Sequence, residues 1–158
     1  MTGKWDRRFL RVAKEVASWS KDPSKQIGAV YVSGDRRILA TGYNGFPRGI
    51  EDADYRYEDR ETKYKFVAHA EMNGIYNATY NGQSLKDSTC YVWGLPVCSE
   101  CAKGLIQVGV TRVVMSANEI PDNWRDSFSE STSMFREVGI EWRFILPNEV
   151  SEKVSYIL

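Results

Sequence analysis

Residues 89–115, TCYVWGLPVCSECAKGLIQVGVTRVVM, carry the pattern that decides the fold. The β-rich run 89–93 predicts a short strand, residues 99–108 predict a helix that ends at Gly109, and residues 112–115 predict a second strand. Two strands joined through a helix favour parallel pairing, because a tight turn can join only antiparallel strands. We therefore expect this stretch to form a strand–helix–strand unit of a parallel sheet.

The flanking segments extend this unit in both directions. Apolar residues recur at spacings of three and four from about residue 4 to 20, which predicts a helix that Asp22-Pro23 stops. The other expected elements are strands 26–33 and 37–43 with a turn at 33–35, helices 68–81 and about 124–138, and a last strand 140–146. A hairpin followed by strands that alternate with helices predicts an α/β fold, a three-layer α/β/α sandwich around a mixed five-stranded sheet. Residues 44–62 have no clean period and are expected to form a long functional loop.

Length and composition indicate one soluble globular domain over residues 1–158. Basic and acidic residues balance at 21 each, so nucleic acid is disfavoured as a partner. We see no signal peptide and no apolar run near the roughly 20 residues of a membrane span, so no membrane association is expected. Three cysteines, two of them in a close pair, indicate metal or redox chemistry in a reducing compartment, and hence a cytoplasmic protein.

Three side chains form a candidate metal site. Cys98 and Cys101 begin the predicted helix 99–108, where residues three apart share a face and the helix N-terminus favours thiolates. His69, the only histidine in the chain, lies at the start of the preceding helix. One imidazole and two thiolates supply three zinc ligands and leave the fourth position to water, which is typical of a catalytic site.

Glu71 lies two residues after His69, and both can face one metal only if the helix begins there. Glu71 would then lie beside the bound water and carry its proton to the substrate. In the alternative, Cys90 closes a structural site as fourth ligand and Glu71 is incidental. Cys90 lies near the beginning of its strand, more than about 10 Å from the strand's far end, so we interpret it as a small core residue.

With these residues the chain resembles the zinc-dependent cytidine/deoxycytidylate deaminase superfamily, and most closely its deoxycytidylate (dCMP) deaminases. The zinc core is shared across the superfamily, whereas GYNGFP at 42–47 narrows the resemblance to dCMP deaminases. The matching segments are 22–29 (DPSKQIGA), 41–47 (TGYNGFP), 69–73 (HAEMN) and 98–103 (CSECAK). Two positions depart from the family pattern: Val97 separates Pro96 from Cys98, and Gly74 stands where relatives often have Ala.

The resemblance implies a cytidine deaminase-like fold and hydrolytic deamination of dCMP to dUMP and ammonia, with dCTP as a second candidate substrate. A zinc-bound water would attack C4 while Glu71 shuttles the proton. The resemblance further implies that Asn44 holds the sugar, while the Ala70 amide and the Glu71 carboxyl read the pyrimidine edge. Trp124-Arg125 matches an aromatic–Arg pair that contacts the 5′-phosphate, and Lys25 and Arg48 are weaker phosphate candidates. The alternative for Trp124 is core packing, and for Arg125 a solvated helix start.

Relatives of this kind are typically homo-hexamers that dCTP activates and dTTP inhibits, which implies the same assembly and effectors here, with Mg²⁺ accompanying a triphosphate. The expected effector site is the loop 45–62, although its aromatic residues also suit interface packing. Two other functions stay open. A polynucleotide deaminase acting on transfer RNA or single-stranded DNA is disfavoured by the balanced charge, and a non-catalytic zinc module that binds nucleotides is disfavoured by Glu71.

Overall fold

A computed structural model describes residues 3–150 of the chain, and its centre is a five-stranded sheet in the order β2-β1-β3-β4-β5. The strands are β1 (Gly28–Val32), β2 (Ile38–Tyr43), β3 (Thr89–Trp93), β4 (Arg112–Ser116) and β5 (Glu141–Phe144). β1 pairs antiparallel with both β2 and β3, whereas β3, β4 and β5 run parallel. The mixed five-stranded sheet and its parallel strand–helix–strand unit are therefore confirmed.

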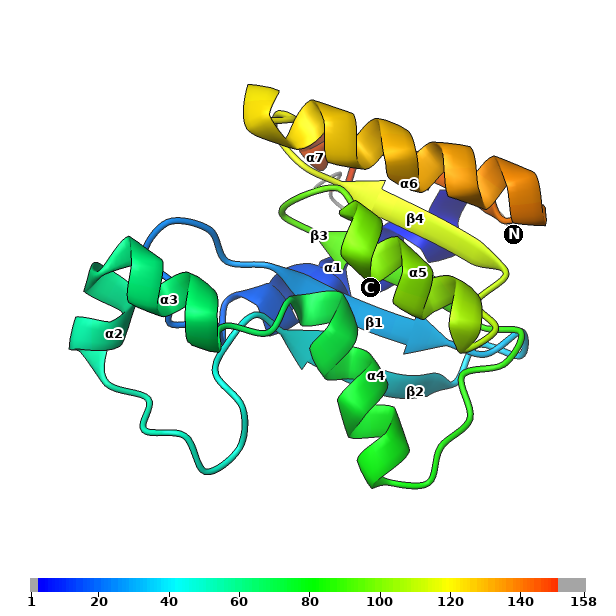
Figure 1. Ribbon diagram of the computed structural model, residues 1–158. Helices are drawn as coiled ribbons and strands as arrows, with labels where there is room; N and C mark the ends of the chain where they lie inside the picture. Colours follow the sequence, from blue (N-terminus) through cyan, green and yellow to red (C-terminus); the bar gives the residue numbers. More distant parts are fainter. Residues whose placement is uncertain (1–2, 151–158) are drawn as a thin grey trace, which may run out of the picture.

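Helices cover both faces of the sheet, so the predicted three-layer sandwich is confirmed (Figure 1). One face carries α1 (Gly3–Ala17) and α7 (Pro147–Val150); the other carries α4 (Ala70–Tyr80), α5 (Ser99–Gln107) and α6 (Arg125–Val138). β1 and β3 are buried along nearly their whole lengths because both of their faces are covered. Among residues 3–150, no helix is both long enough and apolar enough to cross a membrane.

A buried carboxylate pins α1 to the sheet. Asp6 is 0% exposed and accepts hydrogen bonds from Arg112 of β4 at 2.6 and 2.7 Å and from the Tyr91 hydroxyl of β3 at 2.9 Å. Arg143 of β5 adds a contact at 3.1 Å. Burial raises the pKa of Asp6, but hydrogen bonds from Arg112 and Tyr91 outweigh it and hold the pKa below its usual value. The ionised carboxylate therefore ties α1 to three parallel strands.

The prediction of an irregular loop over residues 44–62 is wrong in its second half. This segment contains α2 (Asp54–Glu58) and the start of α3 (Arg60–Phe66), which lie beside the sheet (Figure 1). Helices of one or two turns are too short to show a period in the sequence, and packing has to stabilise them. Here the Phe46 ring stacks on Tyr57 at 4.2 Å between centroids and lies 5.9 Å from Phe66.

The remaining differences concern the ends of elements. β5 is shorter than the predicted strand 140–146, and after two intervening residues α7 begins at Pro147, which suits a first helical position. α1 ends at Ala17, and Trp19 is half exposed instead of continuing the apolar stripe.

Candidate active site

The first turns of α4 and α5 bring the three predicted metal ligands together. His69 is the N-cap of α4 and Cys98 the N-cap of α5, with Cys101 in the first turn of α5. His69 Nδ1 lies 3.4 Å from each of the two Sγ atoms, and all three ligand atoms lie within 4.8 Å of one another. Nitrogen and sulfur ligands of one tetrahedral zinc lie about 3.6 Å apart. The donor set and its spacing therefore fit zinc.

The electrostatics of the cluster favour a thiolate, the form of cysteine that binds metals. A hydrogen bond with Cys101, followed by one with His69, lowers the pKa of Cys98, although burial opposes both. Cys98 Sγ also accepts the backbone N–H of Cys101 at 3.4 Å, as an N-cap side chain does. The pKa of His69 is raised, chiefly by its hydrogen bond with Cys98. These contacts therefore favour the thiolate form of Cys98.

Cys90 belongs to the core. It is 0% exposed on β3, directly opposite Tyr31 of β1, and burial raises the pKa of its thiol well above the usual value. In the described part of the chain, the one group with metal-ligand spacing consists of His69, Cys98 and Cys101. This geometry supports the interpretation of an open, three-ligand site and gives Cys90 no place in it.

Glu71 lies in the first turn of α4, where the helix start at Ala70 lets it share a face with His69. Its side chain is 4% exposed. Burial raises the pKa of the carboxyl to about 7, and the positive charge of His69 opposes the rise. A carboxyl group in this range can both take up and release a proton near neutral pH.

A cavity of about 120 Å³ opens beside the cluster and gathers most of the residues predicted to bind substrate. Five of the six residues predicted to bind substrate line it, together with the predicted metal ligand His69: Lys25, Asn44, Ala70, Glu71 and Trp124. Arg125, the sixth predicted contact, is not one of the described residues that line this cavity. Its side chain is 67% exposed and pairs with Asp122 at 3.0 Å. Arg48 lines a separate hollow, where it hydrogen-bonds to Asn77 and lies over the Tyr80 ring.

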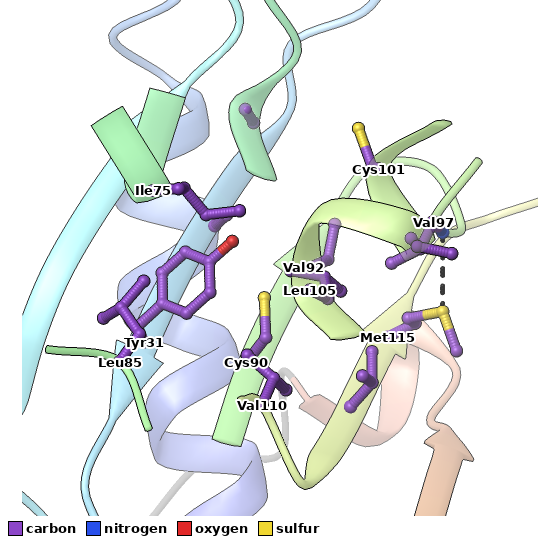
Figure 2. Packing of buried hydrophobic residues seen from close by; sticks show 14 of the residues in the cluster. Tyr31, Ile75, Leu85, Cys90, Val92, Val97, Cys101, Leu105, Val110 and Met115 are labelled. Carbon is purple, nitrogen blue, oxygen red and sulfur yellow. Dashed lines mark hydrogen bonds between the residues drawn. The ribbon is translucent and has the colours of Figure 1, made fainter. Parts of the chain in front are cut away.

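The inserted Val97 is absorbed by the core. Val97 is 0% exposed, its N–H lies 3.5 Å from the Met115 sulfur (Figure 2), and its carbonyl accepts the Ser131 hydroxyl at 2.8 Å. The Trp124 indole donates to the Pro96 carbonyl at 2.8 Å and lies 6.2 Å from the His69 ring. Trp124 therefore holds the loop before Cys98 in place, and it also lines the cavity.

The Asn44 side chain supports the wall of the cavity. Its Oδ1 accepts the Ile27 N–H at 2.9 Å, and its Nδ2 donates to the Lys25 carbonyl at 2.9 Å. Asn44 itself is 6% exposed. The amide therefore holds the segment that presents Lys25, and contact with a sugar would use its remaining hydrogen-bonding capacity.

Lys63 is a cavity residue that the sequence did not indicate. It lies on α3, is 6% exposed, and its Nζ lies 3.3 Å from Asp22 Oδ1. Asp22 Oδ1 also accepts the backbone N–H groups of Ser24 and Lys25. The run of charged residues around Lys63 reads as a solvated surface, and only the fold shows that this lysine turns inward between α3 and Asp22.

Comparisons with known proteins agree with this geometry. A family model of the cytidine and deoxycytidylate deaminase zinc-binding region matches residues 3–117. The human deoxycytidylate deaminase is 35% identical over 149 residues, covering 91% of this chain and 81% of that protein. A probable deoxycytidylate deaminase of Drosophila melanogaster is 34% identical over 162 residues, covering 96% and 77%.

A solved structure shares the fold. The dCMP deaminase of cyanophage S-TIM5, crystallised with dCMP and dUMP, superposes with a TM-score of 0.73 at 21% identity and covers 92% of this chain and 99% of that one. The family match spans more than half of the chain and includes the candidate ligands. The protein therefore belongs to the cytidine and deoxycytidylate deaminase family.

Proposed function

We propose that the protein is a zinc-dependent hydrolase that converts dCMP to dUMP and ammonia. One observation carries the proposal: the buried Glu71 lines the same cavity as His69, whose Nδ1 lies 3.4 Å from the sulfurs of Cys98 and Cys101. A purely structural metal site has no use for an acid at that place. The named activity of the human and Drosophila relatives, and the dCMP and dUMP in the cyanophage structure, support the choice of substrate.

In this proposal each residue at the metal has a defined task. His69, Cys98 and Cys101 would hold zinc, which when bound would lower the pKa of a water molecule and so supply the nucleophile. Glu71 would carry both protons of that water in turn, the first to the ring nitrogen and the second to the departing ammonia. The Ala70 N–H, which as a first-turn amide has no partner inside its helix, binds the pyrimidine carbonyl.

The cavity is too small to enclose a whole nucleotide, so part of the nucleotide extends out of it. A volume of about 120 Å³ is smaller than the roughly 300 Å³ of a typical ligand pocket. The base therefore occupies the deep part, and the sugar and phosphate lie toward Asn44 and Lys25. Because Arg125 does not reach the cavity, we propose Lys63 as a second cation at the phosphate end, in addition to Lys25.

Lys63→Met is expected to raise KM for dCMP about tenfold or more, since a hydrogen bond to a charged group contributes about 1.5–3 kcal/mol. Turnover of deoxycytidine, which has no phosphate, should change little. Lys65→Met is the matched control, because Lys65 lies on the same helix but is 68% exposed and pairs with Glu61. Steady-state kinetics on both substrates checks this. Equal losses on dCMP and deoxycytidine would show that Lys63 only supports Asp22.

The proposed activity is tested by the loss of ultraviolet absorbance from deoxycytidine, dCMP and dCTP, assayed side by side on protein whose zinc content is measured. We expect turnover of dCMP with about one zinc per chain, and the dCTP arm decides whether the triphosphate is also a substrate. Zinc binding without turnover of any cytosine nucleotide would contradict the proposal and favour a non-catalytic nucleotide-binding module.

We also propose that dCTP activates and dTTP inhibits the enzyme, with Mg²⁺ on the triphosphate, and that the protein forms a homo-hexamer. A hollow of about 640 Å³ supports an effector site near the 45–62 segment. Lys21, Arg48 and several aromatic side chains line it, and Lys21 directly precedes the cavity residue Asp22. Repeating the dCMP assay with each triphosphate tests the effectors, and light scattering gives the mass of the assembly.

A single domain over residues 1–158 and a cytoplasmic location complete the proposal. All three cysteines are free thiols, which suits a reducing compartment. Residues 151–158 lie outside the described part of the chain.

A further inference from the structure

Tyr31 forms a buried link between the centre of the sheet and the helix that carries Glu71. It is 0% exposed on β1, and its hydroxyl donates a hydrogen bond of 2.7 Å to the Glu71 carbonyl. Figure 2 shows its ring with Ile75 of α4 on one edge and Cys90 of β3 at its side. Burial raises the pKa of Tyr31 well above its usual value, so the hydroxyl stays protonated and keeps donating. The link therefore persists throughout the pH range of an assay.

Gly74 makes room for this ring. A Cβ atom at position 74 would lie 2.4 Å from Cε2 and 3.0 Å from Cδ2 of Tyr31, far inside van der Waals contact. The ring therefore occupies the space that an alanine side chain would fill. This explains in physical terms why the chain bears the roughly 1 kcal/mol helix cost of a glycine in the interior of α4.

The strand beside β1 holds α4 just as closely. A Cβ at Gly42 of β2 would lie 2.2 Å from the Gly74 backbone nitrogen and 2.4 Å from the Ala70 carbonyl. The helix backbone therefore rests directly on β2, while Tyr31 contacts it both at Gly74 and, one turn earlier, at Glu71. These contacts leave the first turn of α4 little freedom to shift or rotate.

The first turn of α4 supplies His69 and Glu71, whereas α5 supplies both cysteines. The position of the Glu71 carboxyl relative to the sulfurs therefore depends on how α4 is seated on the sheet. We propose that Tyr31, with the space left by Gly74, is a positioning residue that sets the Glu71 carboxyl against the His69, Cys98 and Cys101 cluster. The catalytic consequence of this inference rests on the proposed deaminase function.

Tyr31→Phe is the direct test, because it keeps the ring and removes only the hydroxyl that bonds to Glu71. We expect kcat for dCMP to fall roughly tenfold, since misplacement of a catalytic group by a fraction of an ångström has effects of this size. KM and zinc content should stay within twofold of the unmodified protein. A kcat loss with unchanged KM and metal content distinguishes positioning from general destabilisation.

Tyr91→Phe is the matched control. Tyr91 is also 0% exposed, lies on the neighbouring strand β3, and bonds through its hydroxyl to Asp6 on the far side of the sheet. Tyr91→Phe should lower thermal stability at least as much as Tyr31→Phe does, and its kcat should stay within twofold of the unmodified protein. Gly74→Ala, which pushes the Tyr31 ring away from α4, is expected to lower kcat in the same way as Tyr31→Phe, again with zinc retained.

The outcomes separate this inference from the function on which it rests. If the unmodified protein deaminates dCMP and Tyr31→Phe has an unchanged kcat, Tyr31 is not a positioning residue and the deaminase function stands. If the unmodified protein turns over no cytosine nucleotide, the proposed function fails. Hydrogen exchange at the amides of residues 70–75 then decides: faster exchange in Tyr31→Phe than in Tyr91→Phe supports the anchoring of α4, and equal exchange overturns it.

Discussion

Glu71→Gln is expected to lower kcat for dCMP by roughly 10²–10⁴-fold, the range that a positioned general acid or base contributes. Glutamine keeps the size and much of the hydrogen bonding of glutamate but cannot take up a proton from water. The buried position of Glu71 leaves little access for another base. Zinc content, measured by elemental analysis, should stay near one per chain, because the ligand atoms belong to His69, Cys98 and Cys101.

Glu100→Gln is the control for Glu71→Gln. Glu100 lies between the two cysteines in the sequence, but its side chain is 80% exposed and pairs with Lys103 at 2.7 Å. Its replacement should leave kcat unchanged. A Glu71→Gln protein with nearly full activity would remove Glu71 from the role of proton carrier and leave the metal cluster without an acid.

Cys98→Ala is expected to abolish zinc binding and turnover together. The change removes one of the three ligand atoms, and only His69 and Cys101 would remain to hold the ion. It also removes the acceptor that caps α5, at about 1 kcal/mol of stability. A metal that binds only the folded state stabilises it, so the unmodified protein should melt at a higher temperature with zinc than after chelation, and the variant should show no such difference.

Cys90→Ala provides the comparison for Cys98→Ala. Cys90 is a buried core residue, and its truncation should cost roughly 1 kcal/mol, as the loss of one methyl-sized group does. Zinc content and turnover should remain. Loss of zinc in Cys90→Ala, or retention of zinc and activity in Cys98→Ala, would contradict the three-ligand site and revive a closed site that includes Cys90.

The strand–helix–strand unit was predictable because its signals are local. The apolar runs of β3 and β4 and the glycine that follows α5 lie within 30 residues of one another, and Gly109 adopts the positive φ of 89° that ends such a helix. Parallel pairing then follows from the length of the connection. The short helices α2 and α3 carry no such signal, since they depend on the stacking of Phe46 on Tyr57, which lies 11 residues further along the chain.

The ligands of the candidate metal site were predictable for the same reason, because their signals are also local. Both ligand segments are short motifs at helix starts, where spacing alone places the side chains on one face. Arg125 shows the limit of this reasoning. It follows Trp124 in the sequence, yet Trp124 lines the cavity while Arg125 turns to Asp122, because consecutive residues at a helix start point in different directions.

The sequence by itself determined the succession along the chain of the five strands and the four long helices, the mixed sheet and the identity of the His, Glu and Cys residues at two helix starts. Only the tertiary structure decided that these two first turns face each other, that Lys63 turns inward to Asp22 across 41 residues of chain, and that Tyr31 fills the space above Gly74. The physical reason is the range of the interactions. Periodicity and capping act over a few neighbouring residues, whereas burial, close packing and ion pairing depend on which distant segments the sheet brings into contact.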